Sequence, residues 1–305
     1  MLGLVSHPEC LEHDPGPLHP DTRGRIDAIG NQLIASGLDF VLRHYDAPCV
    51  ERAALERVHA PAYLDRIFAV APQSGSVDID GDTVLSPGTL NAALRAAGAG
   101  VFGVDLIMRG EANPVFCMVR PPGHHAESDR AMGFCLFNNI AVAAAHAMAA
   151  HGIERVAIVD FDAHHGNGTE EIFAGDGRVL FCSSFQHPFY PFTGHESDTT
   201  NLVGVPMSAG AGSAEFRQAV RDHWLPAIDA FAPGMIFISA GFDAHMADDM
   251  SGLALTDADY AWVTGELVRL AAEHGGGRIL SMLEGGYEYH SLARSAAAHI
   301  KALIG

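Results

Sequence analysis

The chain has 305 residues, 48% of them hydrophobic, and a formal net charge of −19 at pH 7. This composition can build one large core, so we expect a single domain over residues 1–305. The negative charge argues against nucleic acid and anionic membranes as direct partners, and it favours cationic ligands such as polyamines or lysine-rich peptides.

The five cysteines are scattered, without a CxxC pair or a disulfide-like spacing, which indicates a reducing compartment. The first residues lack the basic and apolar regions of a signal peptide, and no uninterrupted apolar run reaches the length that spans a bilayer. We therefore expect a cytoplasmic protein. A single lysine against seventeen arginines, with frequent alanine and glycine, suggests a GC-rich bacterial genome.

The first third of the chain predicts two long loops and three helices. The loops are rich in acids, with histidine and proline in the first, and cover 1–20 and 75–88. We expect a structural or substrate-rim role for the histidines of the first loop, and a solvated or substrate-facing position for the second. Hydrophobic periodicity, a proline near one helix start and a glycine after one helix end define the helices. They cover 22–36, a stretch opening at 58–64, and 89–108.

After residue 115 the chain alternates regularly between apolar strands and helices. The predicted strands are 115–119, 156–160, 179–183, 235–239 and 279–283. The predicted helices are 139–151, 169–173, 215–231, 257–274 and 292–303. Such alternation predicts a mostly parallel sheet with helices on both faces.

Four of the predicted strands are followed, at their carboxyl ends, by residues suited to catalysis. These residues are His124 and His125, Asp162 and His164, Asp243, and Tyr287. In an open α/β sheet this edge is where ligands bind. Polar residues scattered by chance would not all fall at one end of the strands, so we predict one site there.

Asp162 and His164 are the first candidates for a metal site. They are two residues apart, so in an extended segment both side chains project to the same side. Two carboxylates as close as Asp160 and Asp162 repel each other unless a cation lies between them. Asp243, which follows an apolar strand and a glycine, is the best third ligand. Two aspartates and one histidine leave an open position, as in catalytic zinc sites, and an oxygen-rich set also tolerates Fe²⁺.

His124 and His125 follow a Pro-Pro-Gly turn, and such an adjacent pair suits proton transfer at a catalytic water. Each imidazole needs an orienting partner, and Asp160 and Asn167 are available as acceptors. Because an amide stabilises an imidazolium less than a carboxylate does, we expect His125 to stay neutral and serve as the base. Tyr287, after two glycines, offers a phenol donor suited to a tetrahedral oxyanion.

Five sequence blocks, in order, match one known family. They are RPPGHHA at 120–126, GFCLFNN at 133–139, VDFDAHHGNGT at 159–169, SAGFDA at 239–244 and LEGGY at 283–287. With these blocks the chain resembles the zinc-dependent histone deacetylase superfamily, which includes bacterial acetylpolyamine amidohydrolases and acetoin-utilisation proteins. A weaker block at 58–64 extends the match. The resemblance implies the single-domain arginase/deacetylase fold, an α/β fold with a central, mostly parallel sheet and helices on both faces.

The resemblance also implies a role for each matching residue. The implied zinc ligands are Asp162, His164 and Asp243. The implied catalytic residues are His124, His125 and Tyr287, with Asp160 and Asn167 as orienting partners. The implied substrate channel has Gly133, Phe134, Tyr190 and Met250, with Gly285 and Gly286 near its floor. A structural K⁺ is implied near Asp160, Asp162, His164, Ser183 and Ser184, partly through main-chain oxygens.

A few positions indicate the branch of the family. Asn167 and Glu284 resemble class II enzymes, since class I enzymes tend to have Asp and Gly there. Tyr287 is retained, so the chain does not resemble the weakened class IIa type. Polyamine-specific relatives tend to place a glutamate at the channel rim, where Met250 stands here. A methionine favours an apolar linker over a free cation, while the neighbouring acids Asp248 and Asp249 keep polyamines open as substrates.

The sequence thus predicts a zinc-dependent amidohydrolase that removes acetyl, or a longer acyl group, from lysine side chains of a peptide or protein or from lysine-like amines. The alternative within the same chemistry is an acetylpolyamine amidohydrolase acting on a small acetylated amine. A non-catalytic binder of acylated amines is disfavoured, because every catalytic position is filled. A homo-oligomer is left open, because the amidohydrolases use a dimer that narrows the channel.

Overall fold

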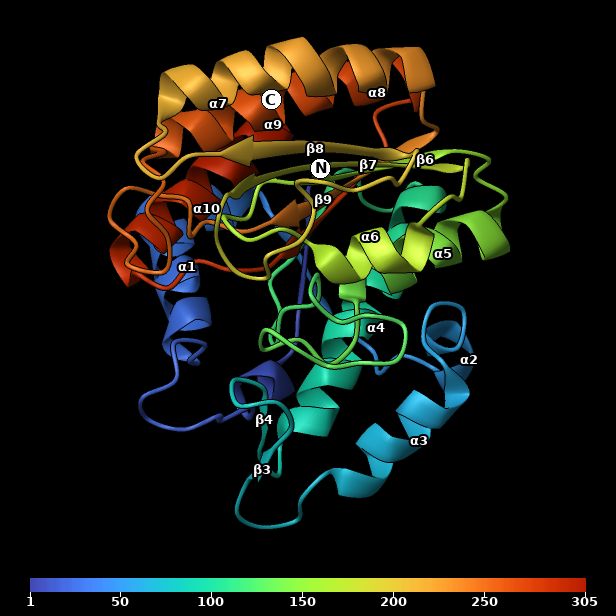
Figure 1. Cartoon of the computed structure of the whole chain (residues 1–305), viewed down its shortest axis with the longest axis vertical. Coiled ribbons are helices and arrows are strands. Elements are labelled where there is room, and N and C mark those ends of the chain that lie inside the picture. The colour runs from blue at the N-terminus through green and yellow to red at the C-terminus, as the bar shows by residue number, and fades with distance from the viewer.

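The computed structural model describes all 305 residues and centres on one eight-stranded sheet (Figure 1). The strand order is β2-β1-β5-β10-β9-β6-β7-β8, and every pairing in this sheet is parallel. The strands are β1 (Gly3–Ser6), β2 (Arg43–Asp46), β5 (Val115–Cys117), β6 (Val156–Asp160), β7 (Val179–Gln186), β8 (Leu202–Met207), β9 (Met235–Ala240) and β10 (Ile279–Leu283). The predicted α/β architecture is confirmed.

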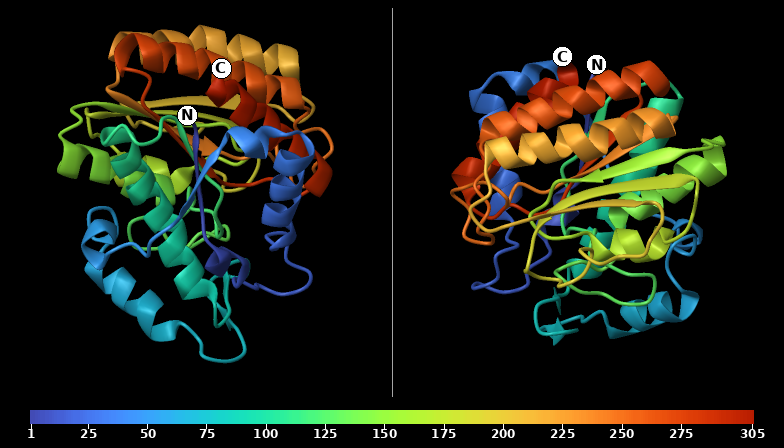
Figure 2. Two further views of the ribbon diagram at one scale, coloured as in Figure 1. Left: turned by 180° about the vertical axis from the view of Figure 1, so that it is seen from behind. Right: turned by 45° about the horizontal axis from the view of Figure 1, so that its top comes forward.

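Helices cover both faces of the sheet, and Figure 1 shows the two layers above and below it. One face carries α1 (Gly24–Ala35), α7 (Ser213–Ala219), α8 (Leu225–Phe231), α9 (Asp257–His274) and α10 (Tyr289–Ile304). The other carries α2 (Arg52–Leu55), α3 (Pro61–Val70), α4 (Thr89–Met108), α5 (Asn139–His151) and α6 (Asn167–Phe173). Helices α1 and α10 pack together although they are far apart in sequence, and the two termini lie near each other (Figure 2).

Successive residues of one strand serve the two cores. In β6, Val156 and Ile158 belong to the core under α4 and α5, whereas Ala157 and Val159 belong to the core under α9 and α10. This is the alternation of a strand that is buried on both faces. The apolar run therefore becomes a central strand, and it carries the fully buried Asp160 at its carboxyl end.

Strands β1, β2 and β8 have no counterpart among the predicted elements. β1 and β2 have four residues each, and β2 is mostly exposed, so neither gives a clear apolar pattern. β8 is largely half-buried and contains Gly204 and Pro206. The loops predicted over 1–20 and 75–88 are therefore wrong in part. The first contains β1, and the second contains the antiparallel hairpin of β3 (Val77–Asp78) and β4 (Val84–Leu85).

Helices α4, α5 and α9 match their predicted ranges at both ends. At the start of α5 the Asn138 side chain accepts a hydrogen bond from the Ala141 N–H, and Gly152 ends the helix with φ 67°. The single helix predicted over 215–231 is instead α7 and α8, joined by the π-helical turn η3 (Val220–Trp224). Pro226, at the start of α8, has no N–H to donate, which interrupts the regular hydrogen bonding.

Helix α4 is the one helix long and apolar enough, by length and composition, to cross a bilayer. Arg95 and Asp105 interrupt its apolar run. In the fold, 61% of that stretch is buried, and α4 packs against α5 and β10. These contacts are those of a core helix, so the length of α4 is weak evidence for a membrane span.

His299, on α10, is a buried histidine away from the predicted site. Its Nδ1 lies 2.6 Å from Thr264 Oγ1 of α9, and its Nε2 lies 2.8 Å from Ser281 Oγ of β10. Burial lowers the pKa of His299 from 6.5 to about 3. The unfolded chain therefore binds a proton at His299 between these pH values while the folded chain does not.

We expect the free energy of unfolding to fall as the pH drops below 6.5, with His299 contributing about 3 kcal/mol of the loss by pH 4. His299→Gln removes this titration, so the decline should be shallower by that amount in urea unfolding measured across pH. His290→Gln, at an exposed histidine of the same helix, should decline as the wild type does. Equal declines for His299→Gln and the wild type would contradict the prediction.

Candidate active site

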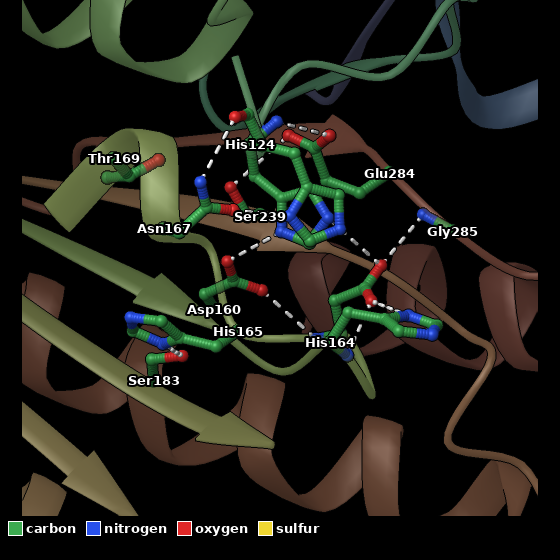
Figure 3. Close-up of polar contacts among 12 residues, drawn as sticks. His124, Asp160, His164, His165, Asn167, Thr169, Ser183, Ser239, Glu284 and Gly285 are labelled. Atoms are coloured by element: carbon green, nitrogen blue, oxygen red, sulfur yellow. Dashed lines mark hydrogen bonds and ion pairs between the residues drawn. The ribbon is translucent and has the colours of Figure 1, made fainter. Parts of the chain in front are cut away.

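Four neighbouring strands bring the predicted site residues to one edge of the sheet. β5, β10, β9 and β6 are adjacent in the sheet order, although they come from residues 115 to 283 of the chain. Their carboxyl ends lead into the segments that carry the tandem histidines, the Asp162 and His164 pair, Asp243 and Tyr287. Figure 3 shows part of this cluster, with polar contacts that join β6, Ser239 of β9 and the segments after β5 and β10.

Asp162, His164 and Asp243 form a buried group whose ligand atoms all lie within 4.8 Å of one another. The His164 Nδ1 is 3.0 Å from Asp162 Oδ1 and 3.1 Å from Asp243 Oδ2. Backbone N–H groups fix both carboxylates, since His164 donates to Asp162 Oδ1 and Ala163 donates to Asp243 Oδ1. Burial and the charge of Asp162 raise the pKa of Asp243 to about 6.

The backbone at Gly285 lies directly against the acids of the candidate metal site, and this close approach requires a glycine after Glu284. The Gly285 N–H donates to Asp162 Oδ2 at 2.9 Å, and a Cβ at this position would collide with the carboxylates of Asp243 and Asp162. The backbone therefore approaches the acids as closely as it can. Two buried carboxylates and one imidazole nitrogen, held this close, fit a small divalent cation such as Zn²⁺ or Fe²⁺, which would offset their negative charge.

The tandem histidines have different partners. His124 Nδ1 lies 2.9 Å from Asp160 Oδ2, and His125 Nδ1 lies 2.8 Å from Asn167 Oδ1. Burial acts to lower the pKa of His124, but the charges of Asp160 and Asp162 outweigh it and raise that pKa to about 10. Burial, with the positive charges of His124 and His164, holds the pKa of His125 well below its usual range. His125 is thus the neutral member of the pair.

Glu127, which the sequence reasoning did not include, fixes the tautomer of His125. Its Oε1 accepts a hydrogen bond from Asn167 Nδ2 at 2.8 Å. A carboxylate only accepts, so the amide NH₂ must face Glu127 and the amide oxygen must face His125. His125 then carries its proton on Nδ1, which leaves the lone pair of Nε2 free. The signal for Glu127 was its place directly after the His-His-Ala block.

Glu284 holds the backbone of the tandem histidines. Its Oε2 accepts hydrogen bonds from the N–H groups of Gly123 at 2.7 Å and His124 at 3.1 Å. Burial raises the pKa of Glu284 to about 7, against the positive charge of His124. Glu284, which directly follows β10, therefore holds the loop after β5 in place at the centre of the site.

A cavity of 180 Å³ reaches this site. Of the predicted channel residues, Gly133, Phe134, Tyr190 and Met250 line it, together with His124, His125, His164 and Tyr287. Gly285 and Gly286 do not line it: the first lies against the acids, and the second packs on Phe242 and Leu292. The Phe134 and Tyr287 rings are 6.0 Å apart at 88°, and the His125 and Tyr190 rings are 5.2 Å apart at 84°.

Phe134 adopts φ 70°, which is uncommon for a residue with a side chain. It follows Gly133, where a Cβ would collide with the His125 ring. The tight turn thus lets the backbone pass the imidazole and turns an aromatic ring toward the cavity. The Gly-Phe-Cys block is a structural requirement of this wall.

Three further residues line the cavity that the sequence reasoning did not name as site residues: Asp82, Pro122 and Phe189. Asp82 lies between β3 and β4, and its Oδ1 accepts a hydrogen bond from the Gly133 N–H at 3.2 Å. His19, from the segment before α1, packs edge-on against Phe134 with ring centres 4.4 Å apart. The segments 1–20 and 75–88, for which a position facing the substrate was one of the expected roles, therefore build one side of the cavity.

The residues predicted to hold K⁺ lie on two adjacent strands and the segment after them. Asp160 of β6 is in register with Ser183 of β7, and Ser184 follows it, buried. The Ser183 hydroxyl lies 3.0 Å from Nδ1 of the buried His165 (Figure 3), and the Nε2 of His165 contacts Glu170. The donors expected for K⁺ are thus neighbours in the fold.

The family model described as "Histone deacetylase domain" matches residues 19–303. The chain belongs to the histone deacetylase family. It is 37% identical to "Probable deacetylase" of Archaeoglobus fulgidus, with 94% of this chain and 81% of the relative covered. It is 36% identical to "Histone deacetylase-like amidohydrolase" of Pseudomonas aeruginosa, with 99% and 80% covered.

Solved structures agree with this membership. The crystal structure of the HDA15 HD domain matches with a TM-score of 0.94 and 36% identity, over 100% of this chain and 88% of that one. The family resemblance and the deacetylase fold expected from the sequence are therefore confirmed. Membership and the names of the relatives support a deacetylase, and hence a hydrolase.

Proposed function

We propose that the protein is a zinc-dependent amidohydrolase that removes an acetyl or longer acyl group from a lysine side chain or a lysine-like amine. The observation that carries this proposal is the buried group of Asp162, His164 and Asp243 beside a narrow cavity that reaches His164. Neutral His125 and protonated Tyr287 line the same cavity.

In this proposal Asp162, His164 and Asp243 hold the Zn²⁺, and Fe²⁺ suits the same donors. When bound, the ion would polarise the amide carbonyl and lower the pKa of a water molecule. The remaining chemistry belongs to the protein's own side chains.

His125 takes a proton from the attacking water at Nε2, the nitrogen that Asn167 leaves free. His124 or His125 then returns a proton to the leaving amine. Because burial holds the pKa of Tyr287 well above its usual range, its phenol stays protonated and donates a hydrogen bond to the oxyanion. The burial of His124 and His125 keeps bulk water away from these proton transfers.

The cavity suits a long, thin substrate. Phe134, Phe189 and Tyr190 offer aromatic walls to the methylene stem of an acyl-lysine. Asp82 adds a carboxylate that can accept a hydrogen bond from a substrate N–H or pair with a cation. These walls favour binding of lysine-like amines over bulky or branched amines.

The further parts of the proposal follow from the family resemblance. A structural K⁺ lies near Asp160, Asp162, His164, Ser183 and Ser184, and the Asn167 and Glu284 positions belong to the class II branch. We also propose a cytoplasmic bacterial enzyme without direct nucleic-acid or membrane partners, in keeping with a net charge of −19. A homo-oligomer is compatible with these features.

The deciding experiment measures hydrolysis of an acetyl-lysine peptide and of acetylputrescine by purified protein loaded with a defined metal. Turnover of the peptide with release of acetate is the expected result. Preference for acetylputrescine would favour the second candidate, an acetylpolyamine amidohydrolase, which Asp82 and the acidic composition support. Tight binding of acylated amines by metal-loaded protein without hydrolysis would instead indicate a binder and refute the proposal.

Met250 provides a test of substrate choice at the cavity. Met250→Glu adds a carboxylate that can pair with the free amine of acetylputrescine. We expect the ratio of kcat/KM for acetylputrescine over the peptide to rise about fivefold, the scale of a partly exposed ion pair. The gain should fade in high salt, and the neutral Met250→Gln should leave the ratio unchanged. An equal ratio in both variants would place Met250 outside the substrate's path.

A further inference from the structure

Asp248 is a buried acid that the mechanism above does not use. It lies in the loop after β9, five residues beyond Asp243, and is only 4% exposed. No arginine, lysine or histidine forms an ion pair with it. A buried carboxylate without a cationic partner is rare, because the loss of hydration must be offset by other contacts.

Backbone N–H groups supply those contacts. Asp248 Oδ2 accepts hydrogen bonds from Tyr287 at 2.6 Å and from Glu288 at 2.9 Å, and Oδ1 accepts one from Met250 at 3.0 Å. The carboxylate thus joins two loops that meet at the cavity. One loop carries Met250, and the other carries Tyr287, and both side chains line the cavity.

The Tyr287 phenol has no hydrogen-bond partner in the structure, so its aim depends on its backbone and on the rings around it. Arg25 lies over the ring at 4.8 Å and donates to the carbonyl oxygens of Gly286 and Glu284. Asp248 is the corresponding anchor for the N–H groups that follow. The segment is held through its carbonyl groups on one side and its N–H groups on the other.

We infer that Asp248 is a positioning residue that aims the Tyr287 phenol at the reacting carbonyl. The inference rests on the proposed function, because it needs Tyr287 as the oxyanion donor. Charge-assisted hydrogen bonds are about twice as strong as neutral ones. They therefore suit a contact that has to keep the backbone of Tyr287 in a fixed position. A donor displaced by about 1 Å can cost a hundredfold in rate.

An amide cannot replace this carboxylate. In Asp248→Asn, the single amide oxygen can face Met250 or the Tyr287 and Glu288 pair, but not both, so one set of N–H groups meets an NH₂ group. Asp248→Glu keeps the charge but pushes the carboxylate one methylene further. Both variants should displace Tyr287 while leaving the groups that hold the metal in place.

The test is a double-mutant cycle with the acetyl-lysine peptide, in which kcat, KM, bound metal and thermal unfolding are measured. We expect Asp248→Asn to lower kcat about tenfold to a hundredfold with little change in KM or bound metal. Tyr287→Phe should lower kcat about 10²–10³-fold. In the Tyr287→Phe background, Asp248→Asn should lower kcat no further, because the donor that it positions is gone.

Asp249→Asn is the matched control, since Asp249 is exposed and does not line the cavity. It should match the wild type. An equal further loss of kcat in both backgrounds, or wild-type kcat in Asp248→Asn, would overturn the inference and leave the proposed function intact. Full turnover by Tyr287→Phe would overturn the oxyanion role itself, and with it this inference. If Asp248→Asn does not fold, Asp248→Glu takes its place in the same cycle.

Discussion

Replacing Asp243 by alanine is expected to abolish hydrolysis and to release the divalent ion. Asp243 is fully buried, and it supplies one of only three donors in the candidate metal site. Its Oδ2 lies 3.1 Å from His164 Nδ1, so its removal leaves one carboxylate and one imidazole. Two protein donors do not retain an ion that catalytic sites hold with three. Metal content by mass spectrometry and peptide hydrolysis should fall together.

A second group in the molecule provides the control. Asp105, His146 and His151 also come within reach of one ion, but they lie between α4 and α5, away from the cavity. Asp105→Ala should change neither the metal retained after dialysis nor turnover. Activity that survives in Asp243→Ala, or metal retained at the wild-type level, would contradict the assigned site. Metal lost from Asp105→Ala alone would move the ion to the other group.

Replacing His125 by alanine is expected to lower turnover by about 10²–10⁴, the usual contribution of a positioned general base. The reason is its neutral state: burial and neighbouring positive charge hold its pKa well below the usual range. Asn167 and Glu127 fix its proton on Nδ1, so Nε2 is the basic nitrogen. The acid limb of kcat/KM in the wild type should accordingly lie below pH 6.5, because the base must lose its proton to act.

Added imidazole supplies a readout for the His125→Ala variant. If the variant lacks only a base, imidazole should restore part of the turnover, and bound metal and thermal unfolding should match the wild type. His146→Ala, at a half-buried histidine distant from the cavity, serves as the control and should keep full turnover. Turnover of His125→Ala within a few-fold of the wild type would remove the assigned role and leave His124 as the remaining candidate.

The sequence predicted those parts of the site whose functional residues lie close together in short, contiguous blocks. Asp162 and His164 are two residues apart at the end of a strand whose apolar run is unmistakable, and the structure brings them to Asp243 as the sheet order requires. A buried parallel strand can be recognised by a continuous run of apolar, β-branched residues, because both of its faces pack against helices. The edge strands gave no such signal, because β2 has only four mostly exposed residues and β8 is largely half-buried and contains Gly204 and Pro206.

Residues that act through backbone contacts escaped the prediction. Two of the three N–H partners of Asp248 lie some 40 residues further on, and no spacing rule links a loop aspartate to them. Asp82 was not singled out from the other acids of its loop, because each strand of the hairpin that presents it has only two residues and gives no pattern in the sequence. Glu127 was visible in the sequence, but its effect on His125 passes through the amide of Asn167, whose orientation only the fold defines.

The order of the strands in space also bears on how the molecule is made. β10 is the last strand of the chain, yet it sits between β5 and β9 in the middle of the sheet. During translation β5 and β9 emerge before β10. The edge of each strand that pairs with β10 therefore stays unpaired until residue 283 has left the ribosome. A nascent chain that stalls before that point lacks both β10 and Tyr287, so its sheet is incomplete at the centre and the proposed oxyanion donor is absent.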